Sequence, residues 1–238
     1  MVEEGFMRIL VVGANGGLGR AIVARALAGG HSVTAFVRDG RTLPGHAGLS
    51  VVLGSVVSEP ERLRGAAAGH DAVLSGLGNP LWLAGKRGPA ITARATGNLI
   101  AAMRAGGVRR IAVPLAWGSG RSRPHASPLV RAAAATLIRR DYADFGAAET
   151  LLEQSGLDWT VAYFGRLTDA PAGPGPHASA ELRAPANLAV SRADLARFIV
   201  DCVVTGSFVR QRVVVSGPPS TQTGLAWRSP PEGGSEQR

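Results

Sequence analysis

The chain has 238 residues, 45% of them hydrophobic and 18% charged, which excludes a disordered or fibrous protein and suits one large α/β domain. The formal net charge is +9, but the arginines stand singly or in pairs without interleaved aromatic residues, so a nucleic-acid groove is not indicated. With a single cysteine, Cys202, no leading signal pattern and no long apolar run, the chain fits a cytoplasmic protein that does not enter a membrane.

Apolar runs of strand length alternate with segments of helical periodicity along most of the chain. The predicted strands are Arg8–Val12, His31–Val37, Ser50–Leu53, Asp71–Leu77, Val108–Ala116, Trp159–Phe164 and Arg212–Ser216. The predicted helices are Gly17–Gly29, Glu61–Ala68, Ala90–Ala105, Ser127–Ser155 with a break near Asp141, and Arg192–Val204. This alternation predicts a doubly wound, mostly parallel sheet with helices on both faces, which is the Rossmann type of α/β fold.

The alternating pattern ends near Gly217. We expect residues 1–217 to form one domain that includes a small C-terminal portion on the substrate side. Residues 218–238 are rich in Pro, Gly, Ser and charge, so we expect a disordered tail there. The segment Asp169–Pro185 is dense in Pro, Gly and Ala and predicts a loop that is able to cover a site.

Three glycines follow the first predicted strand: Gly13, Gly16 and Gly19. Gly13 allows the chain to leave the strand in a conformation that is costly for other residues, and Gly16 leaves room for a phosphate to approach the backbone. Gly19 allows the next helix to pack closely on the sheet. Because the glycines lie between a strand and a helix of a βαβ unit, they predict a turn that binds the pyrophosphate of a dinucleotide.

The second predicted strand is followed by Arg38 and Asp39. An acidic residue at the first of these positions would bind the ribose hydroxyls of NAD, whereas a guanidinium matches the 2′-phosphate of NADP. Arg38 therefore favours NADP(H) over NAD(H). Asp39 remains a candidate for contacts with the ribose.

The segment Arg8–Asp39 reads RILVVGANGGLGRAIVARALAGGHSVTAFVRD, and three later segments add to the pattern. These segments are Gly69–Gly78 (GHDAVLSGLG), Glu149–Tyr163 (ETLLEQSGLDWTVAY) and Ser191–Val200 (SRADLARFIV). In this order they resemble the atypical short-chain dehydrogenase/reductases of the NmrA-like and flavin reductase/biliverdin-IXβ reductase type, an NAD(P)H-binding family. The resemblance covers nearly the whole chain as far as Gly217.

The resemblance implies a set of cofactor-binding residues. The pyrophosphate would lie on Gly13, Asn15, Gly16, Gly17, Leu18 and Gly19, the adenosine phosphate on Arg38, the adenine near Gly54 and Ser55, the ribose beside Gly76, Leu77 and Gly78, and the nicotinamide beside Tyr163, Phe164 and Gly165. Gly54-Ser55 stands where relatives carry Gly-Asp, and Tyr163-Phe164-Gly165 where many carry Arg-Pro-Gly. The second departure predicts a more aromatic nicotinamide pocket.

Many short-chain reductases protonate a carbonyl oxygen with the tyrosine of a Tyr-x-x-x-Lys couple. Tyr142 is followed four residues later by Gly146, and the only lysine is Lys86. Hydride transfer needs only a positioned nicotinamide and an acceptor. The chain therefore favours a flat, conjugated small molecule, such as a flavin, a quinone or an enone, as the acceptor.

The candidate substrate pocket is aromatic and comprises Trp82, Trp117, Tyr163 and Phe164. For each of these aromatic residues, packing in the core is an equally good interpretation. The weak catalytic candidates are Tyr142, His125 and Tyr163, and no metal-ligand spacing is visible.

The leading hypothesis is an NADPH-dependent reductase of a small conjugated substrate, acting as a monomer or homodimer. Two alternatives remain open at this point. One is a non-redox enzyme, such as an isomerase, cyclase or lyase, and the other is a regulator that senses NADP(H).

Overall fold

The computed structural model describes residues 5–39, 43–78, 90–136, 138–185 and 187–217. The strands are β1 (Arg8–Val12), β2 (Ser32–Val37), β3 (Leu49–Leu53), β4 (Ala72–Ser75), β5 (Arg110–Ala116), β6 (Asp158–Phe164), β7 (Arg166–Thr168), β8 (His177–Ser179), β9 (Ala189–Ser191) and β10 (Gln211–Ser216). The helices are α1 (Gly17–Ala28), α2 (Pro60–Ala67), α3 (Thr92–Ala105), the 3₁₀ helix η2 (Gly120–His125), α4 (Pro128–Ala135), α5 (Arg139–Glu153) and α6 (Arg192–Val204).

Eight of these strands form one sheet in the order β3-β2-β1-β4-β5-β6-β10-β8. All neighbours in it are parallel except β8, which pairs antiparallel with β10 at the edge. The order reverses at β1, because β2 lies on one side of it and β4 on the other. Such a switch point opens a crevice at the carboxyl ends of the strands. The predicted doubly wound α/β fold is confirmed.

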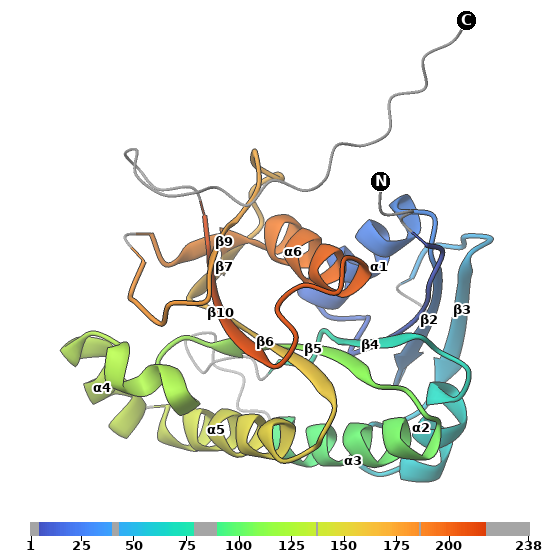
Figure 1. Ribbon diagram of the computed structural model, residues 1–238, viewed down its shortest axis with the longest axis horizontal. Helices are drawn as coiled ribbons and strands as arrows, with labels where there is room; N and C mark the ends of the chain where they lie inside the picture. The colour runs from blue at the N-terminus through green and yellow to red at the C-terminus, as the bar shows by residue number, and fades with distance from the viewer. Residues whose placement is uncertain (1–4, 40–42, 79–89, 137, 186, 218–238) are drawn as a thin grey trace, which may run out of the picture.

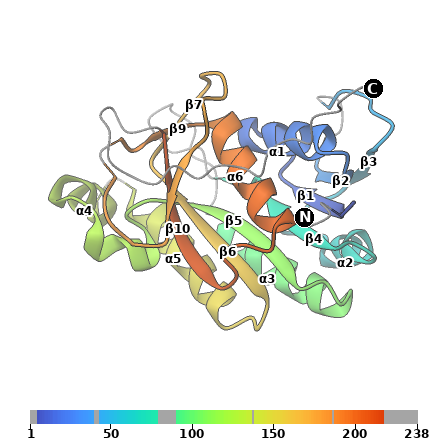
Figure 2. The ribbon, with the colours of Figure 1, turned by 45° about the horizontal axis from the view of Figure 1, so that its top comes forward.

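The sheet is buried between two layers of helices, and Figures 1 and 2 show α1 and α6 side by side on one face. Helices α2, α3 and α5 cover the other face (Figure 1). Along β1, Ile9 and Val11 pack with the α1 and α6 side of the core, while Leu10 and Val12 pack with the α3 and α5 side. Because side chains alternate between the faces of a strand, a strand covered on both faces reads as a continuous apolar run.

Three local predictions differ from the structure. The break expected near Asp141 occurs earlier, at Thr136, which ends α4 and whose hydroxyl donates to the carbonyl of Ala132 at 2.9 Å. Asp141 instead lies in the first turn of α5, where a carboxylate suits the positive end of the helix. The loop expected over Asp169–Pro185 contains β8, which is a three-residue edge strand without Pro or Gly. The segment between the predicted elements Val108–Ala116 and Ser127–Ser155, for which no regular structure was predicted, contains the 3₁₀ helix η2.

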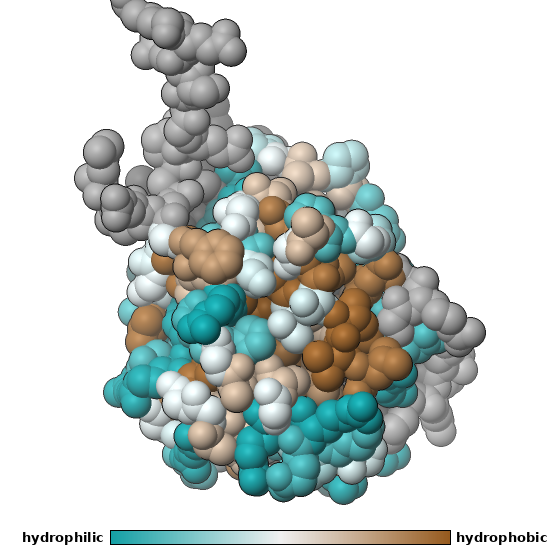
Figure 3. All heavy atoms as spheres, turned by 90° about the vertical axis from the view of Figure 1, so that its right-hand side faces the viewer, coloured by the Kyte–Doolittle hydropathy of each residue, from teal (hydrophilic) through white to brown (hydrophobic). Residues whose placement is uncertain are grey.

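The edge strand β3 exposes apolar side chains, since Val51 and Leu53 are 43% and 51% exposed. Figure 3 views the side of the molecule where β3 and α2 lie and shows apolar residues gathered on it. Gly54 and Ser55 come directly after this strand. No helix in the described ranges is long and apolar enough to span a membrane. The predicted tail, residues 218–238, lies outside the described residues.

One buried arginine ties the centre of the sheet to α6. The Arg110 guanidinium donates to the carbonyl oxygens of Asp158, Cys202 and Ser207 at 2.8 to 2.9 Å and to Thr160 Oγ1 at 2.8 Å. These acceptors belong to β6, to α6 and to the turn that follows α6. The arginine is 9% exposed, so its guanidinium donates hydrogen bonds to buried carbonyl oxygens that water does not reach.

We predict that Arg110→Ala lowers the free energy of unfolding by about 3 kcal/mol, because several buried acceptors lose their donor at once. Arg109→Ala is the matched control. The Arg109 side chain is 63% exposed and its ion pair with Asp158 is at the surface, so the expected change is below about 0.5 kcal/mol. Urea denaturation of both variants measures the difference, and equal effects would contradict this role for Arg110.

Candidate functional site

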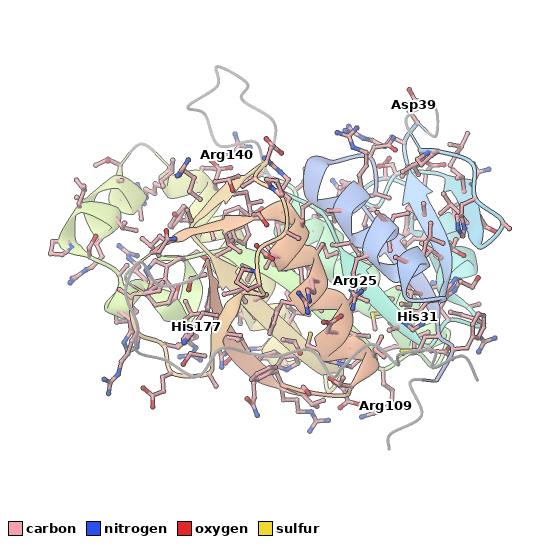
Figure 4. The ribbon with its side chains drawn as sticks, turned by 90° about the horizontal axis from the view of Figure 1, so that it is seen from above. Arg25, His31, Asp39, Arg109, Arg140 and His177 are labelled. Carbon is pink, nitrogen blue, oxygen red and sulfur yellow. The ribbon has the colours of Figure 1, made fainter. Side chains whose placement is uncertain are left out.

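Several of the predicted site residues that the structure describes, among them Gly13, Arg38 and Gly76, lie at the carboxyl ends of the parallel strands. Figure 4 shows Asp39, which follows β2, and Arg140, in the first turn of α5, along one side of the molecule. His31 and Arg109, which precede β2 and β5, lie toward the opposite side (Figure 4). The turn after β1, the segment after β4 and the start of α5 therefore share the edge at which ligands of this fold bind.

The turn after β1 is held by backbone contacts between three glycines. Gly13 has a φ of +70°, which is costly for a residue with a side chain. A Cβ on Gly19 would overlap the Gly13 carbonyl oxygen and lie 2.7 Å from Ala14 Cα. A Cβ on Gly76, which follows β4, would lie 2.6 Å from Gly19 Cα. The backbones of β1, α1 and the segment after β4 thus meet without any intervening side chain.

The outer side of the same turn suits an anion. Gly16 and Gly17 are exposed, and α1 begins at Gly17 with no capping side chain and no acidic residue in its first turn. The first amides of a helix have no intrahelical acceptor, and they carry the positive end of the helix dipole. Leu18 buries its side chain in the core, so any contribution of this residue to the site would come from its backbone N–H.

Asn15 connects this turn to the end of β2. Its side-chain amide donates to the Asp39 carbonyl oxygen, while its own Oδ1 is buried without a hydrogen-bond partner among the described residues. The sequence placed Asn15 on the phosphate. In the structure its amide group joins the glycine turn to the segment that carries Arg38.

A small basic hollow lies at the ends of β2 and β3. It has a volume of about 180 Å³ and is lined by Arg38, Leu53, Gly54, Ser55, Glu59 and Arg62. Arg38, Gly54 and Ser55 were predicted to lie on the adenosine side, and the structure brings them together. Arg62 was not predicted, because it comes from α2 and only the fold places it opposite Arg38. Glu59 accepts from the Ser55 amide at 2.7 Å and lies 3.5 Å from Arg62.

The aromatic residues predicted to border the nicotinamide do not form one pocket wall. Tyr163 is fully buried on the α3 and α5 side of the sheet, whereas its neighbour Phe164 faces the α1 and α6 side. Trp117 is 3% exposed and packs edge-on against Tyr163 at 6.0 Å between ring centres. Strand alternation separates Tyr163 from Phe164, so Tyr163 and Trp117 act as core residues. Trp82 lies outside the described residues.

A larger cavity of about 420 Å³ lies between the turn after β5 and the α4–α5 hairpin. Its lining consists of small residues together with one tyrosine and two arginines: Gly118, Ser119, Gly120, Arg123, Ala134, Ala135, Arg139, Tyr142, Ala143 and Gly146. Only Tyr142 of this set was a predicted site residue. The cavity exists because these residues are small, and small residues do not stand out in a sequence as chemically active ones do.

The two tyrosines near this cavity are poor acids. Burial raises the pKa of Tyr142, and its hydroxyl donates to the Trp117 carbonyl oxygen at 3.1 Å. Burial and the adjacent Glu149 carboxylate raise the pKa of Tyr163 well above its ordinary value. His125 is exposed in η2, and its side chain does not line the cavity. No side chain here corresponds to the low-pKa tyrosine of a Tyr-x-x-x-Lys couple.

Glu149 packs against Gly120, which lines the cavity. Its carboxylate is buried and accepts from the Arg121 amide at 2.9 Å and from Arg212 Nε at 2.5 Å. The Arg212 guanidinium also lies 5.1 Å from the centre of the Trp159 ring. This network holds the turn at Gly120 against α5, and sequence reasoning missed it because its members are far apart in the chain.

A sequence model of the NAD(P)H-binding family matches residues 13–205, from the first glycine of the turn through α6. The chain belongs to the NAD(P)H-binding family. The family resemblance predicted from the sequence is thereby confirmed. The glycine turn, with Gly16 and Gly17 exposed and no capping side chain at the start of α1, fits the pyrophosphate of this cofactor.

Solved structures of similar fold include several NAD(P)-related proteins. The oxidoreductase YlbE from Lactococcus lactis superposes with a TM-score of 0.74 at 18% identity, covering 90% of this chain and 92% of that one. A short-chain dehydrogenase/reductase from Veillonella parvula, solved with NADP, gives 0.74 at 19%, covering 91% and 97%. ChuY, an anaerobilin reductase from Escherichia coli O157:H7, gives 0.72 at 22%, covering 91% and 100%. At these identities the likeness concerns the fold.

We predict that Gly19→Ala both destabilises the protein and impairs binding of the family's cofactor. The new methyl group would overlap backbone atoms of Gly13, which are unable to give way as a side chain does. The expected cost is about 3 kcal/mol of unfolding free energy, with at least a tenfold loss of NADPH affinity.

Gly97→Ala in α3 is the matched control, because its Cβ would meet only Leu151 Cδ1 at 3.8 Å. A helical alanine there should stabilise the protein by about 0.5–1 kcal/mol and leave affinity unchanged. Thermal denaturation and fluorescence titration with NADPH measure both effects. Normal NADPH affinity in Gly19→Ala would show that the close contact is not needed for the site.

Proposed function

We propose that this protein is an NADPH-dependent reductase of a small, flat, conjugated molecule that carries an acidic group. The observation that carries the proposal is the arrangement of one edge of the sheet. The small basic hollow at Arg38 lies on one side of the glycine turn, and the larger cavity at Tyr142 lies beyond it at the end of β5. An extended dinucleotide on this turn would direct its adenosine toward the hollow at Arg38 and its nicotinamide toward the cavity at Tyr142.

The choice of NADPH over NADH rests on the charge of the smaller hollow. Arg38 and Arg62 both line it, and the pairing of Arg62 with Glu59 is long, at 3.5 Å, and exposed. Two guanidinium groups match the 2′-phosphate that distinguishes NADP from NAD. The single cysteine agrees with a reducing cytoplasm, in which such a cofactor is kept reduced.

The class of substrate follows from the lining of the larger cavity. Glycine and alanine leave space for a flat molecule, and Arg123 and Arg139 add positive charge to the lining. Among the described residues, neither of these two arginine side chains forms a hydrogen bond or an ion pair. The cavity therefore suits a conjugated ring system with a carboxylate or phosphate. ChuY, a protein of similar fold, is an anaerobilin reductase.

The reaction needs no strong acid from the protein. When bound, NADPH would supply a hydride. The conjugated acceptor would also take one proton from solvent, so that acceptor, NADPH and one proton give the dihydro product and NADP⁺. The protein's own contribution is to hold the acceptor against the nicotinamide and to exclude competing geometries. The raised pKa values of Tyr142 and Tyr163 agree with this division of roles.

We predict that Arg38→Ala weakens NADPH binding by roughly 1–3 kcal/mol, the range of a charge-assisted contact, and changes NADH binding little. Fluorescence titration with both nucleotides measures the two affinities. Arg64→Ala serves as the control, because this exposed arginine on α2 does not line the hollow, and it should leave both affinities unchanged. Equal losses for NADPH and NADH in Arg38→Ala would contradict the NADP assignment.

We predict that the protein oxidises NADPH in the presence of a conjugated acceptor and prefers FMN to riboflavin, which share one ring system and differ in a phosphate. Arg123→Gln combined with Arg139→Gln should reduce this preference to near one while leaving riboflavin reduction intact. Absorbance of NADPH follows the reaction. Tight NADP(H) binding without turnover of any flavin, quinone or enone would favour a sensing role, and product formation independent of the cofactor's redox state would favour a non-redox enzyme.

We also predict that Tyr142→Phe lowers kcat less than about tenfold, because its hydroxyl is already donated to a backbone carbonyl. Removing a true general acid costs on the order of 100-fold or more. Steady-state kinetics with FMN tests this directly. A loss of that larger size would make Tyr142 the proton donor.

A further inference from the structure

Arg192, the first residue of α6, lies on the turn that binds the cofactor's phosphates in the function proposed above. Its Nε would be 2.8 Å, and its Cδ 3.0 Å, from a Cβ placed on Gly17, the first residue of α1. Gly17 is exposed, so the arginine covers the outer side of the turn, whereas Gly13 and Gly19 face the backbone. The side chain thus brings a positive charge to the amides at the start of α1.

The position of Arg192 is fixed by the packing of α6 on α1. The two helices are also joined by an ion pair between Arg25 and Asp201 at 2.9 Å, and Figure 4 shows Arg25 between them. The start of α6 is fixed by Ser191, whose hydroxyl accepts from the Asp194 amide at 2.9 Å and donates to the Asp194 carboxylate at 2.8 Å. These contacts hold the backbone of Arg192 beside the glycine turn.

The guanidinium is paired with a carboxylate that is easily replaced. Arg192 Nη1 lies 2.5 Å from Asp169 Oδ1, and the Asp169 side chain is 90% exposed while that of Arg192 is 30% exposed. Asp169 comes directly after β7, in a segment that Asp194 also holds by accepting from the Gly173 amide at 3.1 Å. An exposed ion pair contributes little to stability, so a phosphate is able to displace this carboxylate at small cost.

We propose that Arg192 is the cation that binds the pyrophosphate, and that Asp169 occupies its guanidinium when no nucleotide is bound. On this account the two residues act on nucleotide affinity in opposite directions. Arg192 adds charge-assisted hydrogen bonds to the pyrophosphate, whereas Asp169 competes for the same donors. The inference rests on the proposed cofactor site and needs no redox activity.

The test is calorimetric titration of the full chain with NADP⁺ and with NAD⁺, which share the pyrophosphate. Arg192→Gln should weaken binding of both nucleotides by the same factor, roughly 10-fold or more, as expected for the loss of charge-assisted hydrogen bonds. Asp169→Asn should tighten both by about 2- to 5-fold, the size of an exposed ion pair. In the double variant the effect of Asp169→Asn should vanish, because its partner is gone.

Arg197→Gln is the matched control, since Arg197 lies on the same helix, is 31% exposed and pairs with Asp201 rather than Asp169. It should leave both affinities unchanged. Wild-type affinity in Arg192→Gln, weaker binding in Asp169→Asn, or an effect confined to NADP⁺ would each overturn the inference while leaving the proposed function intact. A wild-type chain that binds neither nucleotide would overturn both. Should Arg192→Gln fold poorly, the sign of the Asp169→Asn effect still decides.

Discussion

The close contact of three backbone segments at Gly13, Gly19 and Gly76 is the constraint on which the site depends. A side chain at Gly19 or Gly76 would push α1 away from the ends of β1 and β4. With α1 in place, its first turn is aimed at the crevice where the strand order reverses, and its amides are free of capping side chains. The hollow at Arg38 and the cavity at Tyr142 then lie along the same sheet edge. The missing side chains at Gly19 and Gly76 thus determine where the first turn of α1 lies.

Neither of the two tyrosines near the cavity is placed to act as a low-pKa acid. Tyr142 donates its hydroxyl to a backbone carbonyl, and Tyr163 is buried against Glu149. Burial raises the pKa of both hydroxyls, which agrees with the proposal that the protein positions the acceptor rather than protonating it. A conjugated acceptor suits this arrangement, because such a molecule delocalises the incoming electrons and takes its proton from solvent. On this proposal, the shape and charge of the cavity at Tyr142 determine which acceptor binds.

Local features of the sequence predicted much of the fold and brought several of the candidate site residues to one edge of the sheet. The strands, the βαβ unit and the glycine roles follow from periodicity and from the conformations that glycine alone tolerates, and Gly13 and Gly19 meet those expectations. The sequence left Tyr163 open between pocket and core, because a shift of one residue along a strand moves a side chain to the opposite face of the sheet. Arg62 and Glu149 were missed because only the packing of distant helices brings them to the hollow at Arg38 and the cavity at Tyr142, and Arg192 approaches the glycine turn in the same way. The break at Thr136 carried no Pro or Gly signal.

The most direct test of this account is a crystal structure of the protein with NADP bound. The account predicts that the pyrophosphate lies within hydrogen-bonding distance of the amides at Gly17 and Leu18, with the 2′-phosphate between Arg38 and Arg62 and the nicotinamide toward the turn after β5. A cofactor bound away from the glycine turn, or one running in the opposite direction with its nicotinamide beside β3, would contradict it.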